Sequence, residues 1–276
     1  MAGTTTAGSV RDALGASVDA LTAAGVESPR LDAELLLAEA IGWNRARLTA
    51  DPDAAVPPAA ARLFGESVRR RLRREPVAYI LGRKGFRRIE LAVDRRVLIP
   101  RPETELLVEL AEELRPASVL DVGTGSGAIA LAIADEMPEC EVTATDTSAA
   151  ALQVARANAE QLGLTERVRF LEGSVPASET FELTVANLPY VAGADWSSLQ
   201  PEVTQWEPRE ALLAGSDGLD AIRALIPRVQ RGRLALEVGE GQAEDVAELL
   251  GGAGFAEVRT RRDLAAIERV VWGQRG

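Results

Sequence analysis

The chain has 276 residues, of which 46% are hydrophobic and 26% charged, and its formal net charge is −11. This length suffices for one large domain, or for a large and a small one, and the composition is typical of a soluble globular protein. The absence of histidine excludes Ser-His-Asp and Cys-His nucleophile schemes and histidine-based zinc sites, so we expect no metal site. The acidic balance argues against the whole chain being a duplex-binding protein.

The start of the chain and the distribution of apolar residues bear on location. Met1 to Val10 is small and polar, so we read no secretory signal there. No window has the roughly 18 uncharged apolar residues that a membrane span needs. The single Cys140 cannot form an internal disulfide, which suits a reducing compartment. We therefore expect a cytoplasmic protein with no membrane partner.

Apolar residues recur at helical spacing from Val10 to about Arg74. Ser28-Pro29 and Pro57-Pro58 are typical of helix starts, because proline fits the first turn of a helix. The pattern predicts an N-terminal helical bundle over residues 1–75. Its expected apolar faces are Val10, Leu14, Val18 and Leu21; Leu31, Leu35 and Ala38; and Phe64, Val68 and Leu72.

An arginine run lies near the end of this bundle and consists of Arg69, Arg70, Arg71, Arg73 and Arg74. Between Arg62 and Arg101 the chain has 13 Lys and Arg against 4 Asp and Glu, so this window carries +9 and the remainder −20. A solvated helix face would account for the run. A docking strip for an acidic protein or for RNA is the alternative.

Residues 76–100 are expected to form a linking β-hairpin, with Ile89–Val93 and Val97–Ile99 as its apolar pieces. Pro100-Arg101-Pro102 should stop the second piece. Thr104 is then expected to cap a helix that ends before Pro116.

From residue 101 to 276 we expect the main domain, because strand-like and helix-like segments alternate there. The pattern predicts an α/β fold with a doubly wound, seven-stranded sheet whose last strand is antiparallel. The expected strands are Ser118–Val122, Glu141–Thr145, Val168–Leu171, Leu183–Ala186, Leu234–Val238, Phe255–Thr260 and Ala266–Trp272.

The first of these strands ends in a glycine-rich turn with Gly123, Gly125 and Gly127. Ligands of such sheets bind beyond the carboxyl ends of the strands, where glycine lets the backbone approach closely. Asp146, after the second strand, can accept both hydroxyls of a ribose. Asp121 would repel a pyrophosphate but could pair with an α-amino group, which S-adenosylmethionine (SAM) has. The residues therefore predict a SAM site, against the alternative of a plain tight turn.

A second polar segment, Asn187-Leu188-Pro189-Tyr190, follows the fourth strand. We expect Asn187 to project over the transferred methyl group and to accept one hydrogen of a planar amide or amine, with the Leu188 carbonyl accepting the other. Pro189 favours an extended backbone at Leu188. Tyr190 offers a flat face to the acceptor. This pattern favours methyl transfer to nitrogen.

Several segments resemble the peptide chain release factor glutamine N5-methyltransferases, over about 200 residues up to the C-terminus. They are Arg74–Ile80, Leu98–Glu105, the DVGTGSGAIALA stretch from Asp121, Asn187–Tyr190, Glu207–Leu212 and Asp263–Val271.

The resemblance implies methylation of the glutamine in the Gly-Gly-Gln loop of class 1 release factors, with the bundle as a substrate-docking domain. It also implies SAM contacts at Gly123, Thr124, Gly125, Ser126, Gly127, Asp146 and Asn187, and a glutamine held by Asn187, Leu188, Pro189 and Tyr190.

Two positions depart from the family pattern. The usual tetrapeptide is Asn-Pro-Pro-Tyr, whereas the second position here is Leu188. Leucine keeps the backbone carbonyl, so we expect a loosened geometry. An acidic or aromatic pair commonly follows the third strand, where this chain has Gly173-Ser174-Val175-Pro176. Ser174 could hydrogen-bond the adenine amino group.

Three other functions share these motifs. An adenine-N6 methyltransferase needs a similar amide-like geometry, but the charge of −20 outside one window disfavours a nucleic-acid partner. A glutamine methyltransferase acting on a ribosomal protein would share nearly every motif. In a SAM-binding protein without activity, Leu188 and Ser174 would be signs of a decayed catalytic site.

Overall fold

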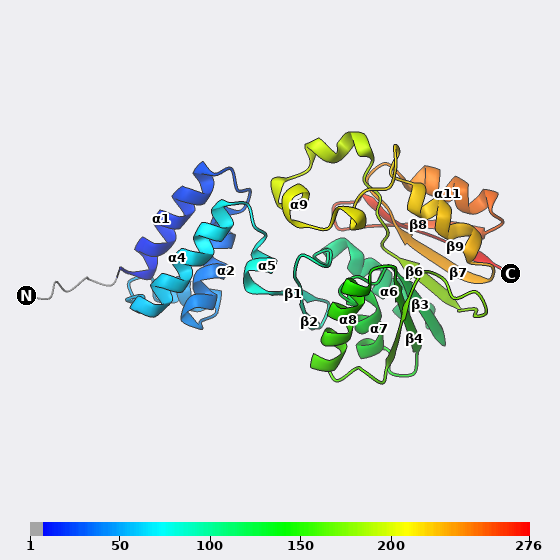
Figure 1. The fold of residues 1–276 in the computed structure, drawn as a ribbon, viewed down its shortest axis with the longest axis horizontal. Helices are drawn as coiled ribbons and strands as arrows, with labels where there is room; N and C mark the ends of the chain where they lie inside the picture. The colour runs from blue at the N-terminus through cyan, green and yellow to red at the C-terminus, as the bar shows by residue number, and fades with distance from the viewer. Residues whose placement is uncertain (1–7) are drawn as a thin grey trace, which may run out of the picture. The chain divides into compact units, whose positions relative to one another are not determined.

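The computed structural model describes residues 8–276, so most of the segment read as lacking a secretory signal lies outside it. The chain forms two compact units, Met1–Gly82 and Arg83–Gly276 (Figure 1). This division differs from the boundaries expected after residues 75 and 100, because the β-hairpin belongs to the second unit. Within residues 8–276 no helix combines the length and apolar character that crossing a bilayer requires.

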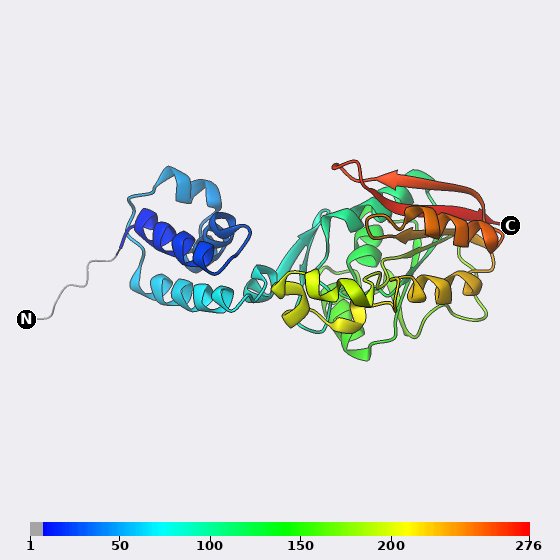
Figure 2. The same cartoon turned by 90° about the horizontal axis from the view of Figure 1, so that it is seen from above.

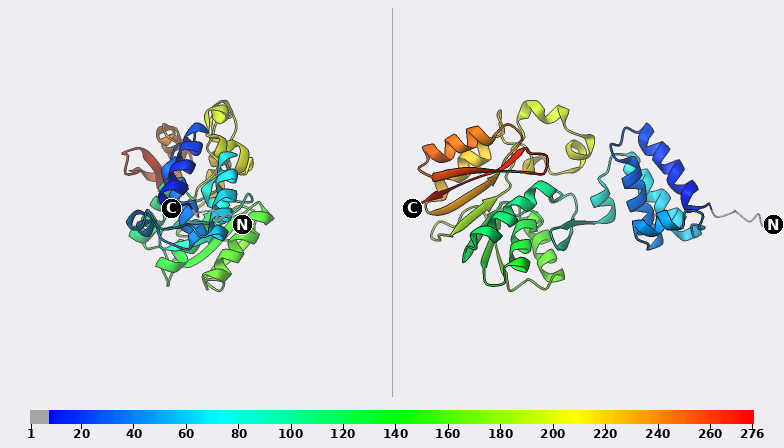
Figure 3. Two further views of the ribbon diagram at one scale, coloured as in Figure 1. Left: turned by 90° about the vertical axis from the view of Figure 1, so that its left-hand side faces the viewer. Right: turned by 180° about the vertical axis from the view of Figure 1, so that it is seen from behind.

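The first unit is a bundle of helices that pack on one another in every view (Figure 3). Its helices are α1 (Val10–Ala23), α2 (Pro29–Ile41), α3 (Arg45–Ala50), α4 (Pro58–Leu72) and α5 (Val77–Leu81). Ser9 caps α1, because its side chain accepts from the Asp12 amide while the Asp12 carboxylate accepts from the Ser9 amide.

The buried face of α2 differs from the expected one. Leu31 is 40% exposed, whereas Ala33, Leu36 and Leu37 are buried. Two carboxylates on the same helix are buried as well, and one of them, Asp32, accepts from Arg71 on α4 at 2.6 Å. This ion pair orients α2, so the apolar spacing of its sequence alone did not identify the inner face.

The arginine run is largely engaged within its own unit. Arg70 donates to both oxygens of Glu75, at 2.5 and 2.8 Å, and Arg71 pairs with Asp32. Arg74 donates to the carbonyl oxygens of Ala24 and Gly25. Three of the five guanidinium groups therefore hold the bundle together, which favours a structural role for them over a docking strip.

The second unit contains a seven-stranded sheet in the order β5-β4-β3-β6-β7-β9-β8. Within this sheet β3, β4, β5, β6 and β7 are parallel, and β9 is antiparallel to both of its neighbours. This confirms the predicted fold class. The strands are β3 (Ser118–Val122), β4 (Glu141–Asp146), β5 (Val168–Glu172), β6 (Leu183–Ala186), β7 (Gly232–Glu237), β8 (Ala256–Arg262) and β9 (Glu268–Arg275).

Apolar residues alternate between the two faces of the sheet, as strand geometry requires. In β7, Leu234 and Leu236 contribute to one buried cluster and Ala235 to the other. Because both faces are covered, the central strands read as continuous apolar runs. Figure 2 shows α11 beside the last two strands, in agreement with the contacts between these elements.

The helices of this unit connect the strands. They are α6 (Glu105–Leu114), α7 (Ala128–Glu136), α8 (Ala149–Gln161), α9 (Pro201–Trp206), α10 (Asp220–Leu225) and α11 (Ala243–Gly252). Four short 3₁₀ segments are η1 (Pro102–Thr104), η2 (Gly193–Ser198), η3 (Arg209–Ala211) and η4 (Ile226–Arg228).

A β-hairpin precedes the sheet, but its strands are β1 (Arg83–Phe86) and β2 (Ile89–Ala92). The expectation that Val97–Ile99 forms one of its strands is therefore wrong. Val97 and Ile99 are buried, yet they lie in an irregular segment whose Ile99 amide donates to Glu207. Burial accounts for the apolar pattern here without a strand.

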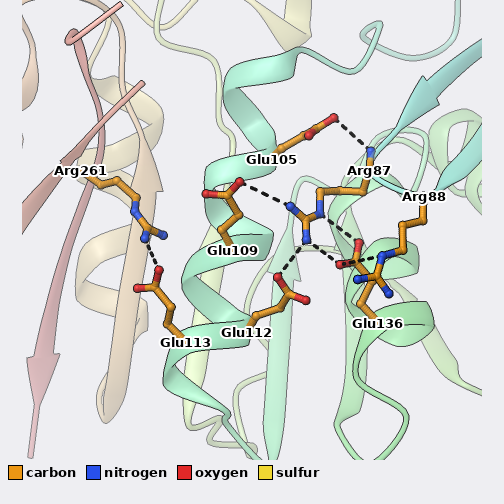
Figure 4. Close-up of polar contacts among 8 residues, drawn as sticks. All are labelled: Arg87, Arg88, Glu105, Glu109, Glu112, Glu113, Glu136 and Arg261. Atoms are coloured by element: carbon orange, nitrogen blue, oxygen red, sulfur yellow. Dashed lines mark hydrogen bonds and ion pairs between the residues drawn. The ribbon is translucent and has the colours of Figure 1, made fainter. Parts of the chain in front are cut away.

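The hairpin turn is held by one arginine that faces four carboxylates (Figure 4). Arg87 donates from its side chain to both oxygens of Glu136, at 3.0 and 2.6 Å, and to Glu112 at 2.8 Å. Its side chain also meets Glu109, and its backbone amide donates to Glu105. These residues, called here the Arg87 cluster, connect the hairpin to α6 and α7.

Candidate functional site

A cavity of about 520 Å³ lies beyond the carboxyl ends of β3, β4 and β6. The strand order reverses between β3 and β6, since the chain proceeds from β3 towards one edge and from β6 towards the other. Ligands of open α/β sheets bind at such a switch point. The volume lies in the range of small-molecule sites, so the fold places a ligand cavity where the sequence predicted one.

The glycine-rich turn forms one wall of this cavity. Gly123 has a φ of 77°, and a Cβ atom there would lie 3.3 Å from Leu188 Cδ2. Gly127 has a φ of 85°, and its Cβ would lie 2.8 Å from Leu131 Cδ1. Both positions therefore need glycine for conformation and for space. Thr124 and Ser126, between the glycines, also line the cavity.

Asp146 ends β4 and lines the cavity. Its Oδ2 accepts from the Gly125 amide at 2.9 Å and its Oδ1 from the Ser148 amide at 2.8 Å. These two bonds fix the carboxylate against the glycine-rich turn and leave lone pairs for further donors. A diol such as a ribose would supply them.

Asp121, expected near the ligand, is not among the described residues that line the cavity. It is fully buried in β3, where Oδ2 accepts from the Thr124 hydroxyl at 2.6 Å and from the Ala130 amide at 3.2 Å. Its Oδ1 has no hydrogen-bond partner among residues 8–276. Burial raises the pKa of Asp121 to about 7. Its contact is with the turn that forms the wall.

The segment after β6 reaches the same cavity. Asn187, Leu188 and Pro189 line it. The Leu188 side chain packs against Gly123 and the apolar cluster beyond it, which explains how leucine is accommodated at this position. Tyr190 is not among the described residues that line the cavity. Its carbonyl accepts from Gln242, its ring lies near Gly239, and burial raises its pKa to about 12.

Thr104, which the sequence predicts to be a helix cap, lines the cavity. Its side chain makes no capping hydrogen bond, and the backbone continues from η1 into α6. The Asn187 Nδ2 instead donates to the Thr104 Oγ1 at 3.0 Å. The Thr104 hydroxyl also interacts with Glu237, a buried carboxylate at the end of β7, and lowers the pKa of that carboxylate against the larger effect of burial. Sequence reasoning missed Glu237 as a site residue.

Two further segments of the family resemblance, Leu98–Glu105 and Glu207–Leu212, meet at the cavity. Glu207, buried just after α9, accepts from the Ile99 amide at 3.1 Å and from Arg101 at 2.5 Å. Leu98 and Pro100 on one side, and Pro208 on the other, line the cavity. Glu207 therefore joins two segments that are distant in the sequence, which local patterns could not reveal.

The structure thus brings most predicted site residues together around one cavity. These are Gly123, Thr124, Gly125, Ser126, Asp146, Ser174, Asn187, Leu188 and Pro189. Asp121, Gly127 and Tyr190 are not among the described residues that line this cavity. Within residues 8–276 no group of three or more potential metal ligands comes together.

The residues present fit SAM. The carboxylate of Asp146 suits the ribose, and Ile129, Ala151 and Leu225 provide apolar wall for an adenine. The buried Asp121 oxygen without a described partner lies beneath the glycine-rich turn, and a cationic ligand bound there would favour the charged form of this carboxyl.

Sequence comparison divides the chain as the fold does. Residues 12–82 match the family described as the PrmC N-terminal domain, and residues 102–204 match the methyltransferase small domain. Among solved structures, the hMettl16 catalytic domain bound to a MAT2A 3′UTR hairpin superposes with a TM-score of 0.55 at 16% identity, covering 67% of this chain and 75% of that one. A methyltransferase from Pyrococcus furiosus gives 0.50 at 17% identity, covering 67% and 88%. These likenesses show the fold.

Relatives of known name match over nearly the whole length. A release factor glutamine methyltransferase of Caulobacter vibrioides is 41% identical over 270 residues, which cover 94% of this chain and 93% of that protein. Its counterpart in Bordetella pertussis is 45% identical over 259 residues, which cover 89% and 94%. With this similarity, and with a cavity built from the segments that carry the resemblance, the chain belongs to the release factor glutamine methyltransferase family.

Proposed function

We propose that the protein transfers a methyl group from SAM to the side-chain amide nitrogen, N5, of the glutamine in the Gly-Gly-Gln loop of class 1 release factors. The observation that carries this proposal is the convergence of Asn187–Pro189 with Asp146 and the glycine-rich turn on one cavity. One group of residues suits the methyl donor and the other suits a planar amide.

The methyl donor is SAM, which supplies an electrophilic methyl group on a sulfonium sulfur when bound. Asp146 would hold the ribose hydroxyls, and the backbone from Gly123 to Ser126 would lie along the ligand. Ser174, which also lines the cavity, would take the adenine amino group. The position of Asp121 behind the glycine-rich turn means that it acts on the donor through charge and through the turn that it supports.

The acceptor is a poor nucleophile, because the lone pair of a primary amide nitrogen is delocalised into the carbonyl. Asn187 Oδ1 would accept one N–H hydrogen and the Leu188 carbonyl the other, so that the nitrogen is aimed at the methyl group. The catalytic gain is mainly positioning, which can amount to several powers of ten. The methylated nitrogen then loses a proton to solvent, so the site requires no general base.

The backbone of Tyr190 is held by a hydrogen bond from the loop that follows β7. Gln242 Nε2 donates to the Tyr190 carbonyl at 2.9 Å, while Gln242 Oε1 accepts from the Gly239 amide at 2.9 Å. Gln242 therefore connects the backbone at the end of the Asn187–Pro189 segment to the loop that follows β7. This support keeps the Leu188 carbonyl in place for the acceptor.

The test offers labelled SAM with three separate acceptors: a class 1 release factor, a ribosomal protein preparation and RNA. We expect label in the release factor, at the glutamine of its Gly-Gly-Gln loop. Label that enters only the ribosomal proteins or only RNA would reject the proposal.

A matched pair of variants tests the division of labour within the cavity. Asn187→Ala should abolish transfer, with SAM affinity retained as measured by calorimetry. Asp146→Ala should weaken SAM binding. Equal losses of SAM affinity in both variants would contradict the assignment of Asn187 to the acceptor.

A further inference from the structure

Glu237 is a buried carboxylate that the proposed reaction leaves without a task. It ends β7, only 2% of its surface is exposed, and its Oε2 has no hydrogen-bond partner among residues 8–276. Burying a carboxylate costs free energy unless neighbouring groups pair with it or donate hydrogen bonds to it. The hydroxyl of Thr104, which is itself only 3% exposed, is the polar neighbour that favours the charged form of Glu237.

The Thr104 hydroxyl has one proton to donate, and a carboxylate can only accept. When the Thr104 hydroxyl donates its hydrogen bond to Glu237, the Thr104 oxygen can only accept from other groups. The group that donates to it is the Asn187 Nδ2, at 3.0 Å. The three side chains therefore form a directed chain from Asn187 through Thr104 to Glu237.

This direction decides which end of the Asn187 amide is committed. With Nδ2 turned to Thr104, Oδ1 remains for the cavity that Asn187 lines. A hydroxyl that was free to donate elsewhere could donate to Oδ1 instead and reverse the amide. The reversed amide would offer N–H groups to an acceptor that also offers N–H groups, so the contact would be lost.

We propose that Thr104 and Glu237 are positioning residues that fix the polarity of the Asn187 amide, so that its oxygen receives the substrate amide hydrogen. This inference rests on the proposed function, since it assigns a role in acceptor alignment. We assign neither residue a contact with the acceptor. Both act through Asn187.

The charged groups around Glu237 make the chain sensitive to pH. Arg101 and Arg269 favour its charged form, Glu103 disfavours it, and the Tyr190 phenol lies close enough to feel its charge. Burial dominates and raises the pKa of Glu237 to about 7. Because the carboxylate form is the one that only accepts, kcat should rise with pH through this region.

The test compares Thr104→Val, which is nearly isosteric but lacks the hydroxyl, with Thr104→Ser, which restores it. For Thr104→Val we expect kcat to fall about 100-fold, as misplaced reacting groups do, with KM for the release factor and the SAM dissociation constant within about twofold of wild type. Thr104→Ser should recover kcat to within a few-fold. Thr184→Val, at a buried threonine of β6, controls for loss of a core hydroxyl and should leave kcat unchanged.

Glu237→Gln tests the direction of the chain. A glutamine can donate to Thr104 as well as accept from it, so the Asn187 amide is no longer held in one sense. We expect kcat to fall about tenfold and to lose its rise between pH 6 and 8, while release factor binding in the presence of S-adenosylhomocysteine is unchanged.

Two results would overturn the inference while the proposed function stands. One is a wild-type enzyme that methylates the glutamine alongside a Thr104→Val variant with undiminished kcat. The other is a Glu237→Gln variant that keeps the wild-type pH profile. A wild-type enzyme that methylates no release factor glutamine would instead reject the proposed function itself.

Discussion

Buried carboxylates of the second unit have contrasting surroundings: Glu136 and Glu207 each pair with an arginine, whereas Asp121 and Glu237 each keep one oxygen without a partner among residues 8–276. In the Arg87 cluster the Glu136 side chain is 1% exposed, and both of its oxygens accept from one guanidinium (Figure 4). Beside the cavity Asp121 and Glu237 are equally buried, but each interacts with a threonine hydroxyl and keeps one oxygen without a partner in the described chain.

The difference appears in proton affinity. The hydrogen bonds from Arg87 lower the pKa of Glu136, so this carboxylate is charged at neutral pH and stabilises the fold. Burial raises the pKa of Asp121 and of Glu237 to about 7, so these two are held at a cost to stability. Carboxylates with perturbed pKa values concentrate at functional sites, and here one contacts the glycine-rich turn and the other interacts with Thr104 of the cavity.

The largest effect is expected from removing the guanidinium of the Arg87 cluster. Arg87→Gly suits the φ of 51° at this residue and leaves Glu136 buried without its main partner. We expect a loss of about 3 kcal/mol in the free energy of unfolding, measured with urea. Arg115→Gly is the matched control, since Arg115 is exposed and has a φ of 48°; it should change stability little. Equal losses in both variants would remove the distinction between the regions.

The second prediction uses pH to separate the two regions. A carboxylate with a raised pKa is protonated in the folded state when it is already ionised in the unfolded state, so stability falls as pH rises from about 4 to 7. Asp121→Asn should therefore gain stability relative to wild type across that interval, by up to a few kcal/mol. Glu136 has a lowered pKa, so its contribution is present above about pH 4.5 and is lost in more acidic solution.

The matched variant for that experiment is Glu136→Gln. Its deficit relative to wild type should be full near pH 6 and should shrink below about pH 4, the reverse of the trend for Asp121→Asn. Thermal unfolding of the three proteins at several pH values measures both trends. Parallel curves for all three would show that the two regions do not differ in proton affinity.

Asp146 sharpens the comparison, because it is a carboxylate whose two oxygens accept from backbone amides while it still faces the cavity. Asp146→Asn should weaken SAM binding about tenfold, since hydrogen bonds to a charged group contribute about 1.5–3 kcal/mol each. Ser148→Ala, at the neighbouring helix cap, should lower stability by about 1 kcal/mol with little change in affinity. Calorimetric titration with SAM would show whether the two variants differ.

The smallest effect is expected at an uncharged position of the site. Leu188→Pro restores the tetrapeptide usual in the family and keeps the backbone carbonyl. We expect kcat to change by no more than about threefold, because positioning depends on that carbonyl and on Asn187. Steady-state kinetics with the release factor measures this change. A loss of a hundredfold would mean that the contact between Leu188 and Gly123 contributes to catalysis directly.

The sheet could be predicted because its information is local. Apolar runs bounded by glycine and proline marked the strands, and the glycine-rich turn marked the switch point between β3 and β6. Parallel strands then place Asp146 and Asn187 at the same edge. The family could be predicted as well, because its diagnostic segments are short and contiguous.

The misreadings arise where distant residues decide the outcome. Thr104 has the composition of a helix cap, yet its hydroxyl serves Asn187 and Glu237. Val97–Ile99 has the apolarity of a strand, but Glu207 binds the Ile99 amide and leaves the segment irregular. The burial of Asp121 accompanies its hydrogen bonds with the glycine-rich turn and with the start of α7. The partners of Thr104 and of Ile99 are distant in the sequence and could not be read from neighbouring residues.

One side chain of α8 joins the hairpin to the glycine-rich turn. Asn158 is buried; its Oδ1 accepts from the Ala92 amide at 2.7 Å, and its Nδ2 donates to the carbonyls of Ala92 and Ser126. If bound SAM stiffens the turn, hydrogen–deuterium exchange at the Ala92 amide should slow. Ala92 itself is not among the residues that line the cavity. Through Asn158, we expect the hairpin to report SAM binding.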